Sequence, residues 1–195
     1  MLAAGRGSRL GLGPKAFVHL DGEALLVRAV ERLRRFGVAP IVAVLPPGPD
    51  PIALPSELIV VRNYDVDTGQ LGSTCLGLDG LSTDLDAVIV YPVDHYAVTD
   101  ADLATLFEAR ALISAECARI VPRWSGRGGH PVMLLPPALQ ALRAVADPGA
   151  TTLRHVLEGA GATHDVKALT GGVRKNLNTP ADLPTGVGSL ASEPQ

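Results

Sequence analysis

A glycine-rich stretch near the amino terminus, from Gly5 to Lys15, has the composition of a loop that binds a chain of phosphates. Gly5 and Gly7 let the backbone turn tightly and approach a ligand with no Cβ atom in the way. Consecutive backbone N–H groups, that of Ser8 among them, can then form a concave anion site. Arg9 and Lys15 add two positive charges. These residue types predict a triphosphate-binding loop, with Arg9 and Lys15 as the catalytic cations.

Three other interpretations of this stretch are weaker. A Walker A loop ends in Gly-Lys-Ser or Gly-Lys-Thr, whereas Lys15 here follows Pro14 and precedes Ala16. A dinucleotide fingerprint has the spacing GxGxxG and an acid about 20 residues further on. The spacing here is GxGxxxG, and the acid would be Glu31, on the polar face of an expected helix. The third interpretation is a glycine-rich surface turn, which the two cations among the glycines make less favoured.

A carboxylate, Asp94, follows a continuous apolar run at 87–91 that is typical of a strand covered on both faces. Proteins hold Mg²⁺ with one or two carboxylates together with phosphate oxygens and water. We therefore expect Asp94 to be a catalytic residue and a Mg²⁺ ligand; its alternative role is to cap a local turn. His95 is a softer ligand than Mg²⁺ prefers, so we expect it to contact the substrate or to be a plain loop residue.

The elements that must position these residues alternate between short apolar runs and amphipathic stretches. Thr99, with Asp102 three residues on, predicts a capped helix start. Such alternation indicates a three-layer α/β fold with a mostly parallel sheet, which binds ligands beyond the carboxyl ends of its strands. Strands are expected at 41–45, 58–61, 87–91, 117–121 and 131–135, and further helices at 24–36, 71–81, 137–145 and 152–157.

The stretch from Leu2 to Lys15 also carries a family resemblance. Its letters LAAGxGSRLG, followed by PK, resemble the signature loop of nucleotidyltransferases with a glycosyltransferase-A-type fold. These include sugar-1-phosphate nucleotidyltransferases and the MobA-like enzymes of molybdenum cofactor maturation. The resemblance implies a Rossmann-like three-layer αβα fold. It also implies nucleotide binding by the loop residues Leu2, Ala3, Ala4, Gly5, Gly7, Ser8, Arg9 and Lys15.

Members of this family have several apolar strand residues ahead of the loop, whereas Met1 stands directly before it here. We therefore expect a shortened first strand of about three residues, which is central in this fold. Either translation starts further upstream or the protein tolerates the stub.

Two further segments resemble loops that contact the substrates in the family. Gly-His-Pro at 129–131 is similar to a loop near the acceptor in the molybdenum cofactor cytidylyltransferase-like branch. This implies acceptor binding by Gly129 and His130, with His95 nearby; without the resemblance, His130 would be a turn histidine. Gly72 and Ser73 lie in a stretch similar to the loop that touches base and ribose, and Ser73 alternatively caps a helix.

The segment at 176–183 resembles the ending Asp-x-Asp-Thr-Pro-Glu-Asp-Leu of the family, but both leading aspartates are asparagines here. The family places a second metal ligand in this segment. An amide oxygen can still ligate Mg²⁺, so we expect Asn178 to be the second ligand, with Asn176 as the fallback. The alternative is that both asparagines only shape the turn before Thr179.

The overall composition narrows the class of protein. A hydrophobic content of 47% in 195 residues supports one sizeable domain, expected at residues 1–183, with a flexible tail at 184–195. The net charge of −3 argues against a nucleic-acid partner, and no apolar run approaches a membrane span. Neither a signal peptide nor a disulfide between Cys75 and Cys117 is expected, so we expect a cytoplasmic protein with free thiols. The oligomeric state stays open.

These observations lead to one main functional hypothesis and three alternatives. The main one is a Mg²⁺-dependent nucleotidyltransferase that moves a nucleoside monophosphate from a nucleoside triphosphate, CTP favoured, to a phosphorylated small-molecule acceptor. A molybdopterin-type acceptor is implied by the resemblance. The alternatives are a sugar-1-phosphate nucleotidyltransferase, a nucleotide-binding module without catalysis, and an NADP-binding oxidoreductase. The last lacks the Tyr-x-x-x-Lys pair of one common type.

Overall fold

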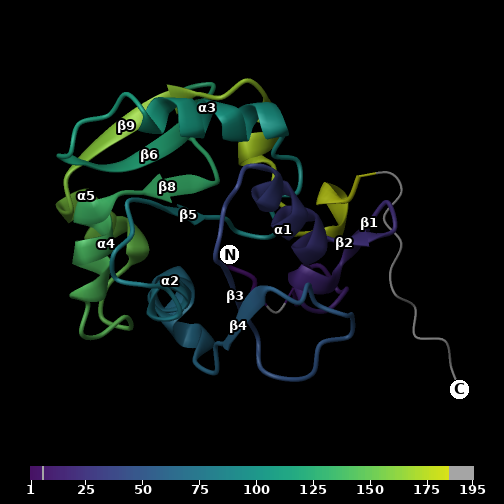
Figure 1. Ribbon diagram of the computed structural model, residues 1–195. Helices are drawn as coiled ribbons and strands as arrows, with labels where there is room; N and C mark the ends of the chain where they lie inside the picture. Colours follow the sequence, from purple (N-terminus) through teal and green to yellow (C-terminus); the bar gives the residue numbers. More distant parts are fainter. Residues whose placement is uncertain (6, 185–195) are drawn as a thin grey trace, which may run out of the picture.

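A β-sheet with both parallel and antiparallel strand pairs forms the centre of the protein (Figure 1). The computed structural model describes residues 1–5 and 7–184. β3 and β4 pair in parallel, and β6 and β9 do the same, whereas β8 runs antiparallel to both of its neighbours, β5 and β6. The strands of this central sheet are β3 (Ile41–Leu45), β4 (Leu58–Arg62), β5 (Val88–Val90), β6 (Cys117–Trp124), β7 (Arg127–Gly128), β8 (Val132–Leu134) and β9 (Ala162–Lys167).

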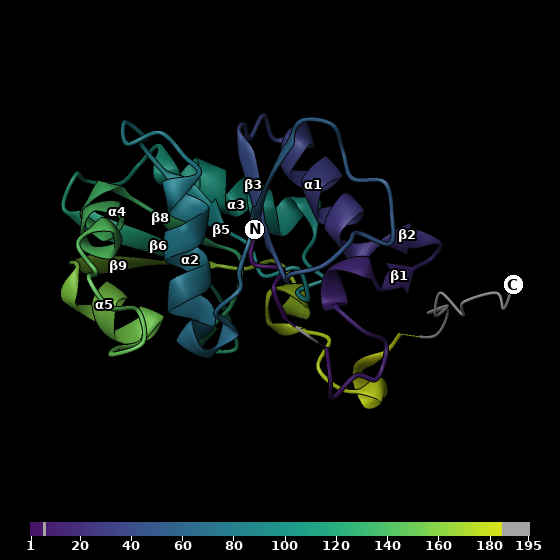
Figure 2. The ribbon, with the colours of Figure 1, turned by 90° about the horizontal axis from the view of Figure 1, so that it is seen from below.

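The first residues of the chain join the two halves of the sheet. Leu2 bridges in parallel to Val44 on one side and to Pro92 on the other. The N–H of Leu2 donates to Tyr91 (2.9 Å), and that of Ala3 donates to Val44 (2.9 Å). The amino terminus therefore lies in the middle of the molecule (Figures 1 and 2). The expected short first strand is confirmed, and it is reduced to these isolated bridges.

Helices cover both faces of the sheet, as the three-layer αβα prediction requires. One apolar core packs α1 and α3 against β3 and β6, and the other packs α2, α4 and α5 against β5 and β8. The helices are α1 (Leu25–Arg35), α2 (Gly69–Asp79), α3 (Asp100–Arg110), α4 (Pro136–Arg143) and α5 (Leu153–Gly159). In the part of the chain that the structure describes, none of these helices is long and apolar enough to cross a membrane.

The local sequence explains which face of α1 is buried and where α3 begins. α1 buries Leu25, Leu26 and Leu33 while Arg34 and Arg35 are exposed, which is the amphipathic pattern of a surface helix. α3 begins at a capping box in which the Thr99 hydroxyl accepts from the Asp102 N–H and the Asp102 carboxylate accepts from the Thr99 N–H. The predicted cap of α3 is therefore confirmed.

The structure differs from the sequence prediction in the start of one helix and in several strands that were not predicted. α2 begins at Gly69, so Ser73 lies inside this helix and the alternative that it caps the helix is wrong. The sequence patterns gave no hint of β9 or of the short hairpin of β1 (His19–Leu20) and β2 (Glu23–Ala24). Of the expected tail at 184–195, residues 185–195 lie outside the described residues. Cys75 and Cys117 are free thiols, as expected.

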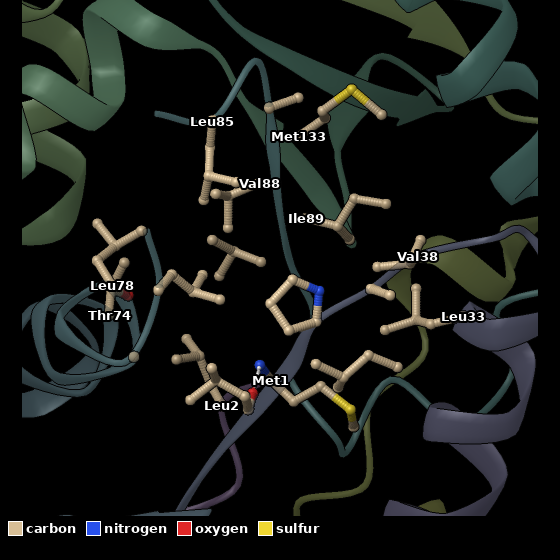
Figure 3. A pocket seen from close by; sticks show the side chains of 18 of the residues that line it. Met1, Leu2, Leu33, Val38, Thr74, Leu78, Leu85, Val88, Ile89 and Met133 are labelled. Carbon is tan, nitrogen blue, oxygen red and sulfur yellow. Dashed lines mark hydrogen bonds between the residues drawn. The ribbon is translucent and has the colours of Figure 1, made fainter. Parts of the chain in front are cut away.

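An apolar cavity lies at the amino ends of β3 and β5, beside Met1 (Figure 3). Its volume is about 240 Å³, and Val38, Val88 and Ile89 are among the side chains that line it. The ammonium group of Met1 donates to the Val42 carbonyl at 2.6 Å, and burial lowers its pKa to about 5. The cavity occupies the place between β3 and β5 where an extension of the first strand would run.

Candidate active site

The glycine-rich loop follows the bridging residues at the carboxyl ends of the parallel strands. Gly7 has a left-handed φ of +63°, and a Cβ atom there would lie 2.0 Å from the carbonyl oxygen of Gly13. Only glycine fits this position without moving the backbone. The Gly7 carbonyl accepts from the N–H groups of Leu10 (2.9 Å) and Gly11 (3.1 Å), which closes the loop. Residue 6 lies outside the described residues.

Three predicted residues from distant parts of the chain meet beside this loop. The Lys15 ammonium lies 2.8 Å from Oδ2 of Asp94 and 2.7 Å from Oδ1 of Asn178. The side chains of Lys15 and Asp94 are only 14% and 18% exposed, so their ion pair is partly shielded from water. Residues separated by up to 163 positions in sequence thus form one charged cluster.

A cavity of about 340 Å³ opens next to this cluster. The residues that line it include Leu2, Ala4, Gly5, Lys15, Asn63, Gly69, Gln70, Ser73 and Asp94. The first turn of α2 faces it, which places the positive end of a helix dipole at one wall. The cavity therefore combines a glycine loop, a helix amino terminus, a lysine and a carboxylate, a set suited to a polyphosphate and its counter-ion.

Asn63 is a cavity residue that the sequence interpretation missed. It is almost fully buried, and its amide donates to the Ser73 hydroxyl at 3.0 Å. Its own backbone N–H donates to Leu45, at the end of the neighbouring strand. A polar residue directly after β4 was the available signal, because the carboxyl ends of parallel strands carry ligand contacts.

Five of the predicted nucleotide contacts are not among the residues that line this cavity: Ala3, Gly7, Ser8, Arg9 and Gly72. Ser8 and Arg9 are exposed on the outer part of the loop. Gly72 points toward Thr68, whose hydroxyl oxygen would lie 1.9 Å from an added Cβ, and it lines a different cavity. The close packing against Thr68 accounts for glycine at this position, so Gly72 is not placed to touch a ligand beside Lys15.

The carboxyl-terminal segment is fixed over the site by its own hydrogen bonds. The Leu177 N–H donates to the Asp94 carbonyl at 3.0 Å. The Asp182 carboxylate accepts from the N–H groups of Asn178 (3.1 Å) and Thr179 (2.8 Å). These bonds aim the Asn178 side chain at Lys15, while Asn176 makes no side-chain hydrogen bond among the described residues. Of the two asparagines, the geometry favours Asn178 for the second ligand position.

His95 and His130 form a buried pair next to Asp94. Their ring centroids lie 4.6 Å apart, and neither Nδ1 atom has a hydrogen-bond partner among the described residues. Burial lowers the pKa of both rings, that of His130 to about 4, so both are neutral at pH 7. The predicted acceptor residues His95, Gly129 and His130 thus lie together on one side of Asp94.

The segment at 171–174 contacts the histidine pair and contains a cation, Arg174, that the sequence interpretation missed. The His130 N–H donates to the Val173 carbonyl at 2.8 Å, and a Cβ at Gly129 would lie 2.5 Å from the same oxygen. Arg174 is exposed, and its charge contributes to the lowered pKa of His95. Glycine at 129 therefore lets the histidine loop pack closely against Val173.

The oxygen atoms of Asp94 and Asn178 fit a divalent cation of the Mg²⁺ type. Both already contact a cation, the Lys15 ammonium, and both are the hard oxygen ligands that Mg²⁺ prefers. Within residues 1–5 and 7–184, no group of three His, Cys, Asp or Glu side chains could hold a metal ion. The remaining ligands would have to be phosphate oxygens and water.

The chain matches a known protein family over most of its length. The sequence profile described as the MobA-like NTP transferase domain matches residues 1–166, which is most of the chain. The chain belongs to this family. The match includes the glycine loop, Asp94 and the histidine pair, whereas Asn178 lies beyond it.

Individual relatives of this MobA-like domain differ in their names. A 2-C-methyl-D-erythritol 4-phosphate cytidylyltransferase of Deinococcus radiodurans is 36% identical over 133 residues, 62% of this chain and 56% of that protein. The chain thus matches only about half the length of this curated relative. A nicotine blue oxidoreductase of Paenarthrobacter nicotinovorans is 29% identical over 145 residues, 69% of this chain and 68% of that protein.

A solved structure supports the fold of the domain. The structure of Rv0371c from Mycobacterium tuberculosis superposes with a TM-score of 0.72 at 20% identity, and it covers 93% of this chain and 92% of that one. At this level of identity the likeness concerns the fold alone. The three-layer fold predicted from the sequence is therefore confirmed both by its own layers and by this comparison.

Proposed function

We propose that this MobA-like domain is a Mg²⁺-dependent nucleotidyltransferase. The observation that carries the proposal is the meeting of Lys15, Asp94 and Asn178 at a cavity lined by the glycine loop and the start of α2. A triphosphate in this cavity would lie against Gly5 and the amino end of α2, with Lys15 neutralising its charge.

The proposed reaction is an in-line displacement at the α-phosphorus. An oxygen of the acceptor phosphate forms a bond to this phosphorus, the bond to the β-phosphate oxygen breaks, and pyrophosphate leaves with that electron pair. Because a phosphate acceptor is already ionised at neutral pH, no general base is needed. Asp94 and Asn178 would hold Mg²⁺, which supplies neutralisation of the phosphate charge. The chain itself contributes positioning and charge.

The acceptor is expected on the side of the histidine pair. His95 and His130 are neutral, so they can hydrogen-bond to a phosphate ester without repelling its counter-ions. Arg174 adds the positive charge that an anionic acceptor requires. CTP is the favoured donor because the Deinococcus relative is named for cytidylyl transfer to a phosphorylated polyol. A molybdopterin-type acceptor and the polyol phosphate of that name are the two acceptors to test first.

An oxidoreductase is the second candidate, since the Paenarthrobacter relative carries that name and matches most of this chain. The site favours nucleotidyl transfer because the lysine and carboxylate are arranged around a cavity suited to a triphosphate.

The deciding experiment supplies purified protein with Mg²⁺, each nucleoside triphosphate and a panel of acceptors, and measures pyrophosphate release. The panel comprises a molybdopterin, 2-C-methyl-D-erythritol 4-phosphate and sugar 1-phosphates. We expect release with one donor and acceptor pair. Triphosphate binding without release would favour a binding module. Oxidation of NADPH with no triphosphate binding would establish the oxidoreductase instead.

A further inference from the structure

The ammonium group of Lys15 already fills the place where a metal ion is expected. We propose that Lys15 occupies this cation site in the nucleotide-free protein, so that a divalent ion binds tightly only after a triphosphate has drawn Lys15 away. The inference rests on the proposed function for the identity of the triphosphate. It assigns to Lys15 a second role, that of a positioning residue which couples metal binding to nucleotide binding.

The geometry places Lys15 between both expected metal ligands. Its Nζ atom is 2.8 Å from Oδ2 of Asp94 and 2.7 Å from Oδ1 of Asn178, which are ordinary distances for charge-assisted hydrogen bonds. A divalent ion of the Mg²⁺ type would need these same oxygens at about 2.1 Å. The ammonium and the metal therefore compete for the same two atoms.

The charges around the cluster make this competition strong. Asp94 and Lys15 neutralise each other, and Asn178 adds no charge, so the site offers a second cation little attraction. The next carboxylate along the chain, Asp182, is engaged by the N–H groups of Asn178 and Thr179. An arriving metal ion would meet a positive charge in a partly shielded site, where like charges repel more than in water.

A bound triphosphate would give the Lys15 ammonium a new anionic partner, so that it can leave Asp94 and Asn178. Lys15 lines the cavity together with Ala4 and Gly5, so its ammonium can turn toward a ligand there without moving the backbone. The lysine side chain has a flexible four-carbon stem that suits such a movement. Once it has turned, Asp94 and Asn178 are released to the metal. By linkage, the bound metal must then tighten the triphosphate by the same factor.

The test measures Mn²⁺ binding as a stand-in for Mg²⁺, from the electron paramagnetic resonance signal of the free ion. Titrations are run without nucleotide and with the α,β-methylene analogues of the four triphosphates, corrected for Mn²⁺ bound by the free analogue. In the wild-type protein we expect one analogue to tighten Mn²⁺ binding on the order of tenfold, within the usual range of site-to-site coupling.

Lys15→Met should bind Mn²⁺ without nucleotide about tenfold more tightly than the wild type, and the analogue should tighten its Mn²⁺ binding by a smaller factor than in the wild type. Lys15→Gln keeps a hydrogen-bond donor without the charge and should behave similarly. Lys167→Met is the matched control, because it removes the same charge from an exposed position on β9. It should bind Mn²⁺ as the wild type does.

The proposal is overturned if the folded Lys15→Met or Lys15→Gln protein binds nucleotide-free Mn²⁺ no more tightly than Lys167→Met. Failure of the proposed function looks different: no analogue would bind the wild type, while the nucleotide-free comparison would still decide the role of Lys15.

Discussion

Replacing Gly7 with alanine should weaken triphosphate binding by roughly 30- to 100-fold. The residue has a φ of +63°, a conformation that costs an alanine about 1 kcal/mol. The new Cβ would also lie 2.0 Å from the Gly13 carbonyl oxygen, far inside the closest normal approach of 3.0 Å. Forcing this backbone apart adds about 1–2 kcal/mol. The sum of about 2–3 kcal/mol corresponds to the stated loss, since 1.4 kcal/mol is tenfold in affinity.

The loop supplies its own control in Gly11. It has a similar φ of +76°, but an added Cβ there has no atom within 4 Å. Gly11→Ala therefore carries only the backbone cost and should weaken binding about fivefold. Isothermal titration calorimetry with a triphosphate and Mg²⁺ compares the two variants, and thermal unfolding checks that both are folded. Equal affinities for Gly7→Ala and Gly11→Ala would refute the assignment of this loop geometry to phosphate binding.

Three further predictions concern stability and pH. Asp102→Asn should lower the free energy of unfolding by about 2–4 kcal/mol at pH 7, because the carboxylate accepts hydrogen bonds from Thr99 and Thr170. Burial alone would raise the pKa of Asp102, but these bonds outweigh it and hold the pKa below its ordinary value. The stability that the Asp102 carboxylate contributes is therefore present above about pH 4, and it is lost as the pH falls through the lowered pKa of Asp102 in the folded protein. Urea denaturation should thus show the wild type and the variant converging in acid, and an undiminished difference at low pH would contradict this. Since the pKa of His130 is about 4, the pH–rate profiles of the wild type and His130→Gln should have the same shape from about pH 6 to 8; a step in the wild type alone would contradict this. Four valine or isoleucine residues added before Met1 should fill the apolar cavity of about 240 Å³ and raise the Tm by roughly 3–8 °C, whereas four glycine or serine residues should not.

The layered fold was predictable because its signals are local. The strand at 41–45 is a continuous apolar run, and α1 has an apolar stripe with arginines opposite, so periodicity alone identifies both. β9 could not be found in this way. It is mostly exposed and carries His164, Asp165 and Lys167, so only its pairing with β6 makes it a strand. Tertiary pairing overrides such weak local preference.

The candidate site was predictable to the extent that it depends on strand ends and loops. Asp94 and Lys15 stood out because a carboxylate after a buried strand and a lysine after a glycine loop have few structural uses. The contact of the Lys15 ammonium with both Asp94 and Asn178 could not be predicted, because it depends on how a segment 163 positions after Lys15 folds back. Gly72 shows the opposite case, since a local pattern suggested a ligand contact where packing against Thr68 explains the glycine.

The central claim, nucleotidyl transfer at Asp94, is tested most directly by following an α-³²P label from the triphosphate. We expect wild-type protein with Mg²⁺ to transfer the label to a phosphorylated acceptor and to release unlabelled pyrophosphate. Asp94→Ala should lower this transfer at least on the order of 100-fold, because the charge that holds the metal is lost. Unchanged label transfer in Asp94→Ala would contradict the role of Asp94, and a wild-type protein that neither binds nor turns over any triphosphate would contradict nucleotidyl transfer.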